Sequence, residues 1–217
     1  LGKAGSVIND ASGIINIGES SQGMYFKDEG APLNIFTNNG QLLSSSTDTV
    51  GMYLDNPTST IITNTGTINL TGDKSRGIYI TNNGATTVTN TGNITVGGSS
   101  VINDPSIGIY SENSTDTINN TGNITAGVNS LGIYSKTAIV NHLSGTIKVG
   151  DNGTAIYSDQ GNITIGSGAT ITLGTKNAVA AYGINSSSIA NSSNINIGND
   201  NYGFIIQSGS TLVNNGA

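Results

Sequence analysis

Acidic side chains that follow the tyrosines are the first candidates for chemistry in this 217-residue sequence. Asp28 and Asp55 come three and two residues after a tyrosine, while Glu112, Lys136 and Asp159 each come two residues after one. Glycoside hydrolysis needs two carboxylates roughly 5 to 10 Å apart, a separation that acids in neighbouring repeats would satisfy. We interpret these side chains as solvated loop positions, because the sequence lacks a pectinase-like cluster of Asp with His and Arg-x-Lys.

Other catalytic or metal-binding motifs find no support. His142 is the one histidine and there is no cysteine, so neither a metal cluster nor a nucleophile with its base can be assembled from the usual residues. A serine elbow, a phosphate loop and a calcium-binding glycine repeat are also missing. The charged run 73–76 is expected to solvate a loop edge. The sequence therefore predicts a non-enzymatic protein with no cofactor and no metal.

Tyrosines in a recurring Gly-x-Tyr phrase are the next candidates. Because Val50, Met52 and Leu54 alternate with Tyr53, we expect the tyrosines to face outward when these apolar residues face inward. Such a column could bind a sugar or a protein, or its rings could simply stabilise one another. The phrase drifts to Tyr182-Gly183-Ile184 and Tyr202-Gly203-Phe204 near the end of the chain. The proposed binding column consists of Tyr25, Tyr53, Tyr79, Tyr110, Tyr134 and Tyr157.

A second candidate surface is the longest interruption between repeats, residues 97–107. It contains Asn103, Asp104 and Pro105, and the proline indicates a loop that leaves the regular structure. Loops on a rigid scaffold often carry recognition, so we include Asn103 and Asp104 among the candidate binding residues.

Two further repeated features must position these residues. One is an apolar segment ending in Asn, usually as Asn-x-Gly, whose amides we expect to stack as a hydrogen-bonded ladder at a turn. The other is an alternating apolar pair, which recurs from Ile68 at intervals of 26, 30, 23, 24 and 24 residues, as far as Ile195 and Ile197. The predicted structural asparagines are Asn38, Asn64, Asn90, Asn120, Asn191 and Asn214.

The repeat predicts an all-β fold. Each feature is short, alternates apolar with polar residues and is rich in β-branched side chains, while Asn-Gly and Thr-Gly pairs supply turns. A unit of about 25 residues cannot bury its own apolar face, but stacked units can. We therefore predict a single-stranded parallel β-helix (β-solenoid) spanning 1–217, with about eight coils and three short strands per coil.

Composition narrows the functional classes. Hydrophobic residues make up 35% and charged residues 9% of the chain, and the net charge is −6, which disfavours nucleic acid or an anionic membrane as a partner. The sequence begins without Met or an apolar signal stretch and has no run of 18 apolar residues. We interpret it as an excised piece of a longer protein.

The Gly-Ile-Tyr, Asn-Thr-Gly and Asn-Ile-Thr phrases at this spacing resemble the passenger region of type V autotransporter adhesins, most closely the Asn-rich passengers of fusobacterial outer-membrane autotransporters. The likeness covers the chain from about Val7 to Ala217 and concerns repeat style, since no ligand motif is matched. It implies a right-handed β-helix on the surface of a Gram-negative bacterium, carried by a parent with a signal peptide and a C-terminal membrane barrel. This sequence contains neither of those ends.

By this resemblance, the chain is expected to be a surface-exposed adhesin segment. Its partner would be a protein or glycan on a host or bacterial cell, and the fragment itself would be monomeric. Two alternatives remain open from the residues alone: a carbohydrate-active β-helix enzyme, and a structural spacer without a ligand.

Overall fold

The computed structural model describes residues 5–27, 34–55, 59–81, 84–113 and 115–216, and over these residues every regular element is a β-strand. The strands form a 14-stranded and an 8-stranded parallel sheet. The larger sheet contains β1 (Ser6–Asn9), β2 (Ile14–Asn16), β4 (Asn34–Asn38), β5 (Gln41–Ser44), β7 (Ser59–Asn64), β8 (Thr67–Leu70), β10 (Ala85–Asn90), β11 (Asn93–Val96), β13 (Thr117–Asn120), β14 (Asn123–Ala126), β16 (Ile139–Val149), β18 (Asn162–Thr172), β20 (Ser188–Asn191) and β22 (Thr211–Asn214). The smaller sheet contains β3 (Gln22–Lys27), β6 (Val50–Asp55), β9 (Arg76–Thr81), β12 (Ile107–Ser111), β15 (Leu131–Ser135), β17 (Thr154–Asp159), β19 (Val179–Ile184) and β21 (Tyr202–Ile206).

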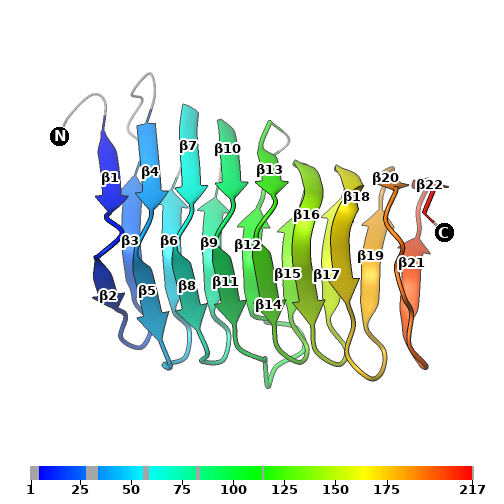
Figure 1. The fold of residues 1–217 in the computed structure, drawn as a ribbon, viewed down its shortest axis with the longest axis horizontal. Helices are drawn as coiled ribbons and strands as arrows, with labels where there is room; N and C mark the ends of the chain where they lie inside the picture. The colour runs from blue at the N-terminus through cyan, green and yellow to red at the C-terminus, as the bar shows by residue number, and fades with distance from the viewer. Residues whose placement is uncertain (1–4, 28–33, 56–58, 82–83, 114, 217) are drawn as a thin grey trace.

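The chain winds as a β-solenoid of about eight coils. In each coil it runs down two strands of the larger sheet at the front of Figure 1 and returns upward through one strand of the smaller sheet behind, while the coils advance from left to right. This sense is right-handed, as expected. In the sixth and seventh coils the two front strands merge into the 11-residue strands β16 and β18. No helix capable of crossing a membrane occurs in the described ranges.

Aliphatic side chains fill the space between the sheets in columns, as the alternating pairs predict. In one column Leu42, Ile68, Ile94, Ile124 and Ile147 are each at most 1% exposed, and each lies in register with its neighbour in the next coil. Each side chain thus packs on the equivalent side chain one coil away, and stacking supplies the burial that one coil lacks.

The apolar pair of the last full coil departs from this pattern. Ile195 is only partly buried against the core and Ile197 is 40% exposed, and both lie outside any strand. Our prediction that this pair continues the column was therefore only half right. Strand β20 pairs with β18 over four residues and the chain then leaves the sheet, so no strand holds Ile197 inward.

A ladder of asparagine amides runs along the solenoid where the upper strands of the larger sheet end. Each Nδ2 group donates to Oδ1 of the next coil: Asn38 to Asn64 at 2.8 Å, Asn64 to Asn90 at 2.8 Å and Asn90 to Asn120 at 2.7 Å. These amides are fully buried. Asn9, which the sequence pattern did not include, begins the ladder with a 2.9 Å bond to Asn38. The predicted ladder is therefore present and one rung longer.

The ladder changes character in the later coils. Asn120 Nδ2 lies 3.0 Å from Nδ1 of buried His142, which occupies the next rung. Because this ring nitrogen faces an amide donor, the neutral tautomer with its hydrogen on Nε2 fits, and Nε2 lies 3.3 Å from the Thr170 carbonyl oxygen. Ile165 takes the following rung, and the amide contacts resume with a 2.7 Å bond from Asn191 to Asn214.

Glycine in the Gly-x-Tyr phrase marks a close approach between the sheets. A Cβ atom at Gly77 would lie 2.5 Å from the carbonyl oxygen of Gly108 and 2.6 Å from Cγ2 of Ile94. Both distances are far inside van der Waals contact, so a side chain at Gly77 would force neighbouring atoms to shift. The phrase therefore combines a tight corner, which holds Gly or Ala, with an outward position at Tyr.

Two late copies of this phrase were aligned incorrectly from the sequence. Tyr182 does pair with Tyr157, but the seventh copy is Ala180-Ala181-Tyr182, because Gly183 pairs with Ser158. Tyr202 pairs with Val179 and so lies outside the tyrosine column, where Ile205 takes the next place. Alanine at the glycine position hid the correct register from a pattern based on Gly.

Candidate functional site

Seven tyrosines form a continuous outer column on the smaller sheet, and neighbouring ring centroids are 4.7 to 5.4 Å apart. Tyr110, Tyr134 and Tyr157 are stacked nearly parallel, with interplanar angles of 9° and 7°. Tyr182 breaks the stack, because its ring lies at 86° to that of Tyr157. Along the column the structure places Tyr25, Tyr53, Tyr79, Tyr110, Tyr134, Tyr157 and Tyr182.

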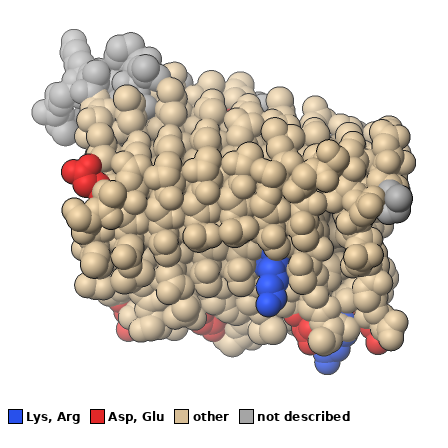
Figure 2. Space-filling model, viewed as in Figure 1, with Lys and Arg blue, Asp and Glu red and all other residues tan. Residues whose placement is uncertain are grey.

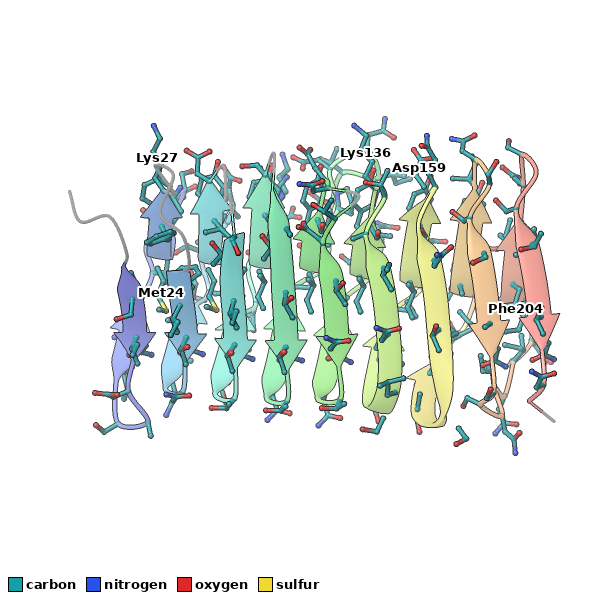
Figure 3. The ribbon with its side chains drawn as sticks, turned by 90° about the horizontal axis from the view of Figure 1, so that it is seen from above. Met24, Lys27, Lys136, Asp159 and Phe204 are labelled. Carbon is teal, nitrogen blue, oxygen red and sulfur yellow. The ribbon has the colours of Figure 1, made fainter. Side chains whose placement is uncertain are left out.

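The acids that follow the tyrosines make local contacts. Asp55 accepts a 3.1 Å hydrogen bond from the Tyr25 hydroxyl, and Glu112 accepts one from the Tyr110 hydroxyl. Glu112, Lys136 and Asp159 directly follow the paired residues Ser111, Ser135 and Ser158, so they occupy equivalent positions in successive coils, with Lys136 in the middle one. Lys136 and Asp159 point outward at the same edge of Figure 3, away from the interior in which Met24 lies. Asp28 lies outside the described residues.

A left-handed turn residue precedes every column position by five residues, except in the fourth coil. These residues have φ between 52° and 58° and are mainly Asn or Asp, which accept this conformation most readily after glycine. Nδ2 of Asn152 donates to Oδ1 of Asn129 at 2.9 Å, and Asn177 donates to Asn152 at 3.2 Å, so an exposed second amide ladder forms here. The turn residues are Ser20, Asp48, Lys74, Asn129, Asn152, Asn177 and Asp200.

Pro105 occupies this turn position in the fourth coil and explains the loop at residues 97–106. Proline fixes φ near −65° and cannot adopt the left-handed turn, so the chain must reach β12 by another route. The loop is anchored rather than loose: Ser99 Oγ donates to the Asp104 carbonyl oxygen at 2.7 Å, and Asn129 Nδ2 donates to the Ser99 carbonyl oxygen at 2.8 Å. At its tip, Ile102 is 76% exposed.

The loop and the tyrosine column together form a groove of about 260 Å³, which we call the loop–tyrosine groove. It lies between the left-handed turns and the column, over the fifth to seventh coils, so it joins the two surfaces that the sequence predicted separately. The groove is lined by Ile102, Pro105, Asn129, Leu131, Tyr134, Asn152, Thr154, Tyr157 and Tyr182.

An arginine occupies the corresponding space in the third coil. Arg76 stands at the strand position that Leu131 and Thr154 hold in the fifth and sixth coils. Its guanidinium carbon lies 5.2 Å from the centroid of the Tyr79 ring, and its Nη2 donates to Asp104 at 3.2 Å. Asp104 also pairs with Lys74 at 3.5 Å. Asp104 therefore anchors the loop through its carboxylate, while its predicted neighbour Asn103 is exposed to solvent.

Two of the tyrosines that line the groove carry hydroxyl groups that the protein itself does not use. Among the described residues, the hydroxyls of Tyr134 and Tyr157 have no protein hydrogen-bond partner, in contrast to those of Tyr110 and Tyr182, which bond Glu112 and Gln207. Asn129 and Asn152 each use one Nδ2 hydrogen in the exposed ladder or the loop, and a primary amide has two. The groove thus offers donors and acceptors to a ligand.

Burial and nearby acids keep the groove phenols protonated. Desolvation, followed by the negative charge of Asp159, raises the pKa of the Tyr134 hydroxyl above its usual value of 10. The pKa of Tyr157 is raised by the same burial and then by neighbouring Tyr134 and Asp159. The two hydroxyls are therefore neutral donors and acceptors at physiological pH. None of the nine lining residues carries a charge.

Asp116 is the buried acid among the residues that the structure describes. Its Oδ2 accepts a 2.6 Å hydrogen bond from Ser111 Oγ and its Oδ1 accepts a 2.9 Å bond from the Thr86 backbone N–H. Desolvation outweighs these two bonds and raises its pKa to about 6. Because Ser111 belongs to β12 and Thr86 to β10, the Asp116 carboxyl links these two strands to the start of β13.

The broad face of the larger sheet carries little charge. In the view of Figure 2 it is almost without charged side chains, and most of the acidic and basic groups visible there lie along its lower edge. In the described ranges, no three His, Asp or Glu side chains are arranged to hold a metal ion.

Comparisons with protein-family models, curated proteins and solved structures find no match to this chain. The groove and its contacts are therefore the basis on which a function can be argued.

Sequence reasoning missed several members of the groove. Asn129 and Asn152 carried a usable signal, because each stands five residues before a tyrosine, as does Asn177. Ile102 lay inside the predicted loop but was not singled out. The predicted residues Tyr25, Tyr53 and Tyr79 belong to the column but not to the groove lining.

Proposed function

We propose that this chain is a non-enzymatic, surface-exposed adhesin segment, part of an autotransporter passenger that attaches a Gram-negative bacterium to host or neighbouring cells. The observation that supports attachment most directly is the loop–tyrosine groove, an uncharged concave site with unused hydroxyls on a rigid stack of strands. The repeat style of the sequence supports the surface location. A single small groove would bind weakly, and display of many copies on one cell would raise the effective concentration.

The local bonding of the acids favours binding over hydrolysis. Glu112 and Asp159 each accept a hydrogen bond from the protein, from Tyr110 and Asn185 respectively, and Lys136 lies between them in register. A hydrolase would need these two groups to face one shared bond of the substrate.

Bead display tests the proposal. Beads coated densely with the fragment should attach to host epithelial cells or to bacterial cells, whereas the free fragment should bind weakly. The variant Tyr79→Ser, Tyr110→Ser, Tyr134→Ser should attach less, provided that circular dichroism shows the β-sheet to be intact. If coated beads attach to no cell, the spacer alternative replaces adhesion. If the fragment shortens a polysaccharide, the enzyme alternative replaces adhesion.

A further inference from the structure

We infer that the loop–tyrosine groove binds one ring of a neutral glycan. This inference deepens the proposed adhesive function and rests on it for its biological setting, while its chemistry depends on the groove alone. The groove of about 260 Å³ is smaller than the ~300 to 1,000 Å³ of typical sites for drug-sized ligands, so it has room for one ring-sized group.

The groove is amphipathic in the way that a sugar ring is. Among the lining residues, Ile102 and Pro105 supply aliphatic carbons, and Tyr134 and Tyr157 supply aromatic rings whose hydroxyls have no partner among the described residues. A sugar ring likewise carries C–H groups on its faces and hydroxyls at its rim. A purely apolar ligand would cover the phenol hydroxyls without bonding them, at a cost of about 1 to 3 kcal/mol for each polar group left unpaired.

The tyrosine stack is also interrupted at the groove. Where rings are stacked in parallel, each face is covered by its neighbour, so a ligand meets mainly edges and hydroxyls. Tyr182 is turned by 86° relative to Tyr157 and is held by a 2.6 Å hydrogen bond from its hydroxyl to Gln207 Oε1. The groove therefore combines stacked edges with one ring set across them, a mixed aromatic surface found at no other step of the column, where interplanar angles are 48° or less.

Charge decides between neutral and anionic glycans. The lining has no charged residue, so nothing in it would pair with a carboxylate or sulfate. Burial is the first cause that opposes ionisation of Tyr134 and Tyr157, and the charge of Asp159 acts in the same sense. Glu112 and Asp159 outnumber Lys136 between them, and the chain carries a net charge of −6, so the surroundings disfavour a sialic acid, a uronic acid or a sulfated sugar.

A printed array of neutral and anionic glycans, probed with the multivalent fragment, tests the inference. Neutral glycans should bind and sialylated or sulfated forms should not. Methyl glycosides of neutral hexoses and N-acetylhexosamines should then shift the NMR methyl signal of Ile102. The variant Tyr134→Phe, Tyr157→Phe should weaken binding about tenfold or more, while Tyr53→Phe, which removes a hydroxyl from the same column outside the groove, should change it less than twofold.

Several outcomes would overturn the inference: no neutral glycan binds, anionic glycans bind equally well, or the double variant binds as tightly as Tyr53→Phe. Circular dichroism and thermal unfolding check that all variants fold, and Ile102→Ser offers a second, purely surface substitution that should also weaken binding. If beads attach to cells but the array is blank, adhesion stands and the glycan inference fails. If the array binds neutral glycans but beads attach to no cell, the glycan inference stands and the adhesive function fails.

Discussion

The asparagine ladder and the tyrosine column are built by the same repeat, yet they differ in burial and in unused bonding capacity. From Asn38 to Asn120 each amide is fully buried and donates to the next at 2.7 to 2.8 Å. Tyr25 at the end of the outer column is 49% exposed, and hydroxyls such as those of Tyr134 and Tyr157 have no partner among the described residues. Periodicity alone therefore does not separate side chains whose hydrogen bonds hold the fold from side chains that keep bonding capacity unused.

Burial explains the difference. An interior polar group must find a partner within the protein, because leaving it unpaired forfeits its solvation. A partly exposed hydroxyl is satisfied by water until a ligand replaces that water. The inner ladder therefore uses its bonds for the fold, while the outer column keeps some available.

The largest effect on the free energy of unfolding should come from placing a charge on the core-facing side of a strand. Ile94 is 1% exposed, whereas neighbouring Thr95 faces outward and is half-buried. Ile94→Asp should lower the free energy of unfolding by roughly 3 to 5 kcal/mol, because the carboxylate would have no partner. Thr95→Asp should change it by less than about 0.5 kcal/mol. Equal unfolding midpoints in urea for the two variants would contradict the assigned faces.

Removing one rung of the inner ladder should have the next largest effect. Asn90→Leu leaves the Asn64 donor and the Asn120 acceptor without their partner and should cost about 1 to 3 kcal/mol. Asn93 provides a matched control, since it joins an exposed amide pair with Asn123 at 3.0 Å. Asn93→Leu should be nearly neutral in the same urea titration, and a cost as large as that of Asn90→Leu would remove the distinction between buried and exposed amides.

Protonation of His142 should disturb the asparagine ladder with a smaller effect on stability. Burial lowers the pKa of this imidazole below its usual 6.5, so on acidification the unfolded chain takes up the proton first. The stability contributed by neutral His142 is thus complete above pH 6.5 and declines as pH falls through 6.5 toward the folded-state pKa. Unfolding of His142→Asn should lack this decline, as measured by the pH dependence of its urea midpoint relative to the parent.

Asp116 should act in the opposite direction over a neighbouring range. Its folded-state pKa of about 6 exceeds the unfolded value of 3.8, so the folded chain takes up this proton first, and stability rises as pH falls from 6 toward 3.8. The difference between the parent and Asp116→Asn isolates this term. A difference that does not change with pH would mean that Asp116 is not desolvated.

The smallest effect on stability should come from the outer hydroxyls. Tyr134→Phe and Tyr157→Phe keep the ring contacts of 4.9 and 5.3 Å and remove only groups without a protein partner. Each should change the free energy of unfolding by less than about 0.5 kcal/mol. A loss above 1 kcal/mol in thermal or urea unfolding would show that these hydroxyls stabilise the fold. The tyrosine column would then resemble the asparagine ladder in its structural role.

Much of the fold could be predicted because each repeated structural position has its own short sequence motif. Asn-x-Gly gives the turn amide, Ile-x-Val the core column and Gly-x-Tyr the corner with its outward ring. Prediction failed where another residue met the same steric need. Ala180 satisfies the corner where glycine was expected, so the phrase was aligned on Gly183 and Tyr182 was left out of the predicted column, although it lies in register with Tyr157. Tyr202 was assigned to a copy of the phrase but lies outside the column.

The groove was harder to predict because it depends on the direction in which the loop at residues 97–106 folds over the sheet. The length of the insertion and its proline are visible in the sequence, but the side to which Ile102 folds depends on bonds across coils, such as that from Asn129 to Ser99. The column and the loop were each predicted as binding surfaces, and which of their residues bind a ligand remains a prediction.

Contacts limited to adjacent coils have an evolutionary consequence. Because each strand pairs only with the equivalent strands before and after it, duplication of one coil within the chain would create a new coil with both neighbours already compatible. Such a duplication N-terminal to the third coil, or C-terminal to the seventh, would lengthen the molecule and leave the groove unchanged. One between the fourth and seventh coils would separate Ile102 from Tyr182. Lineages could thus vary length freely on either side of a block of coils inherited as a unit.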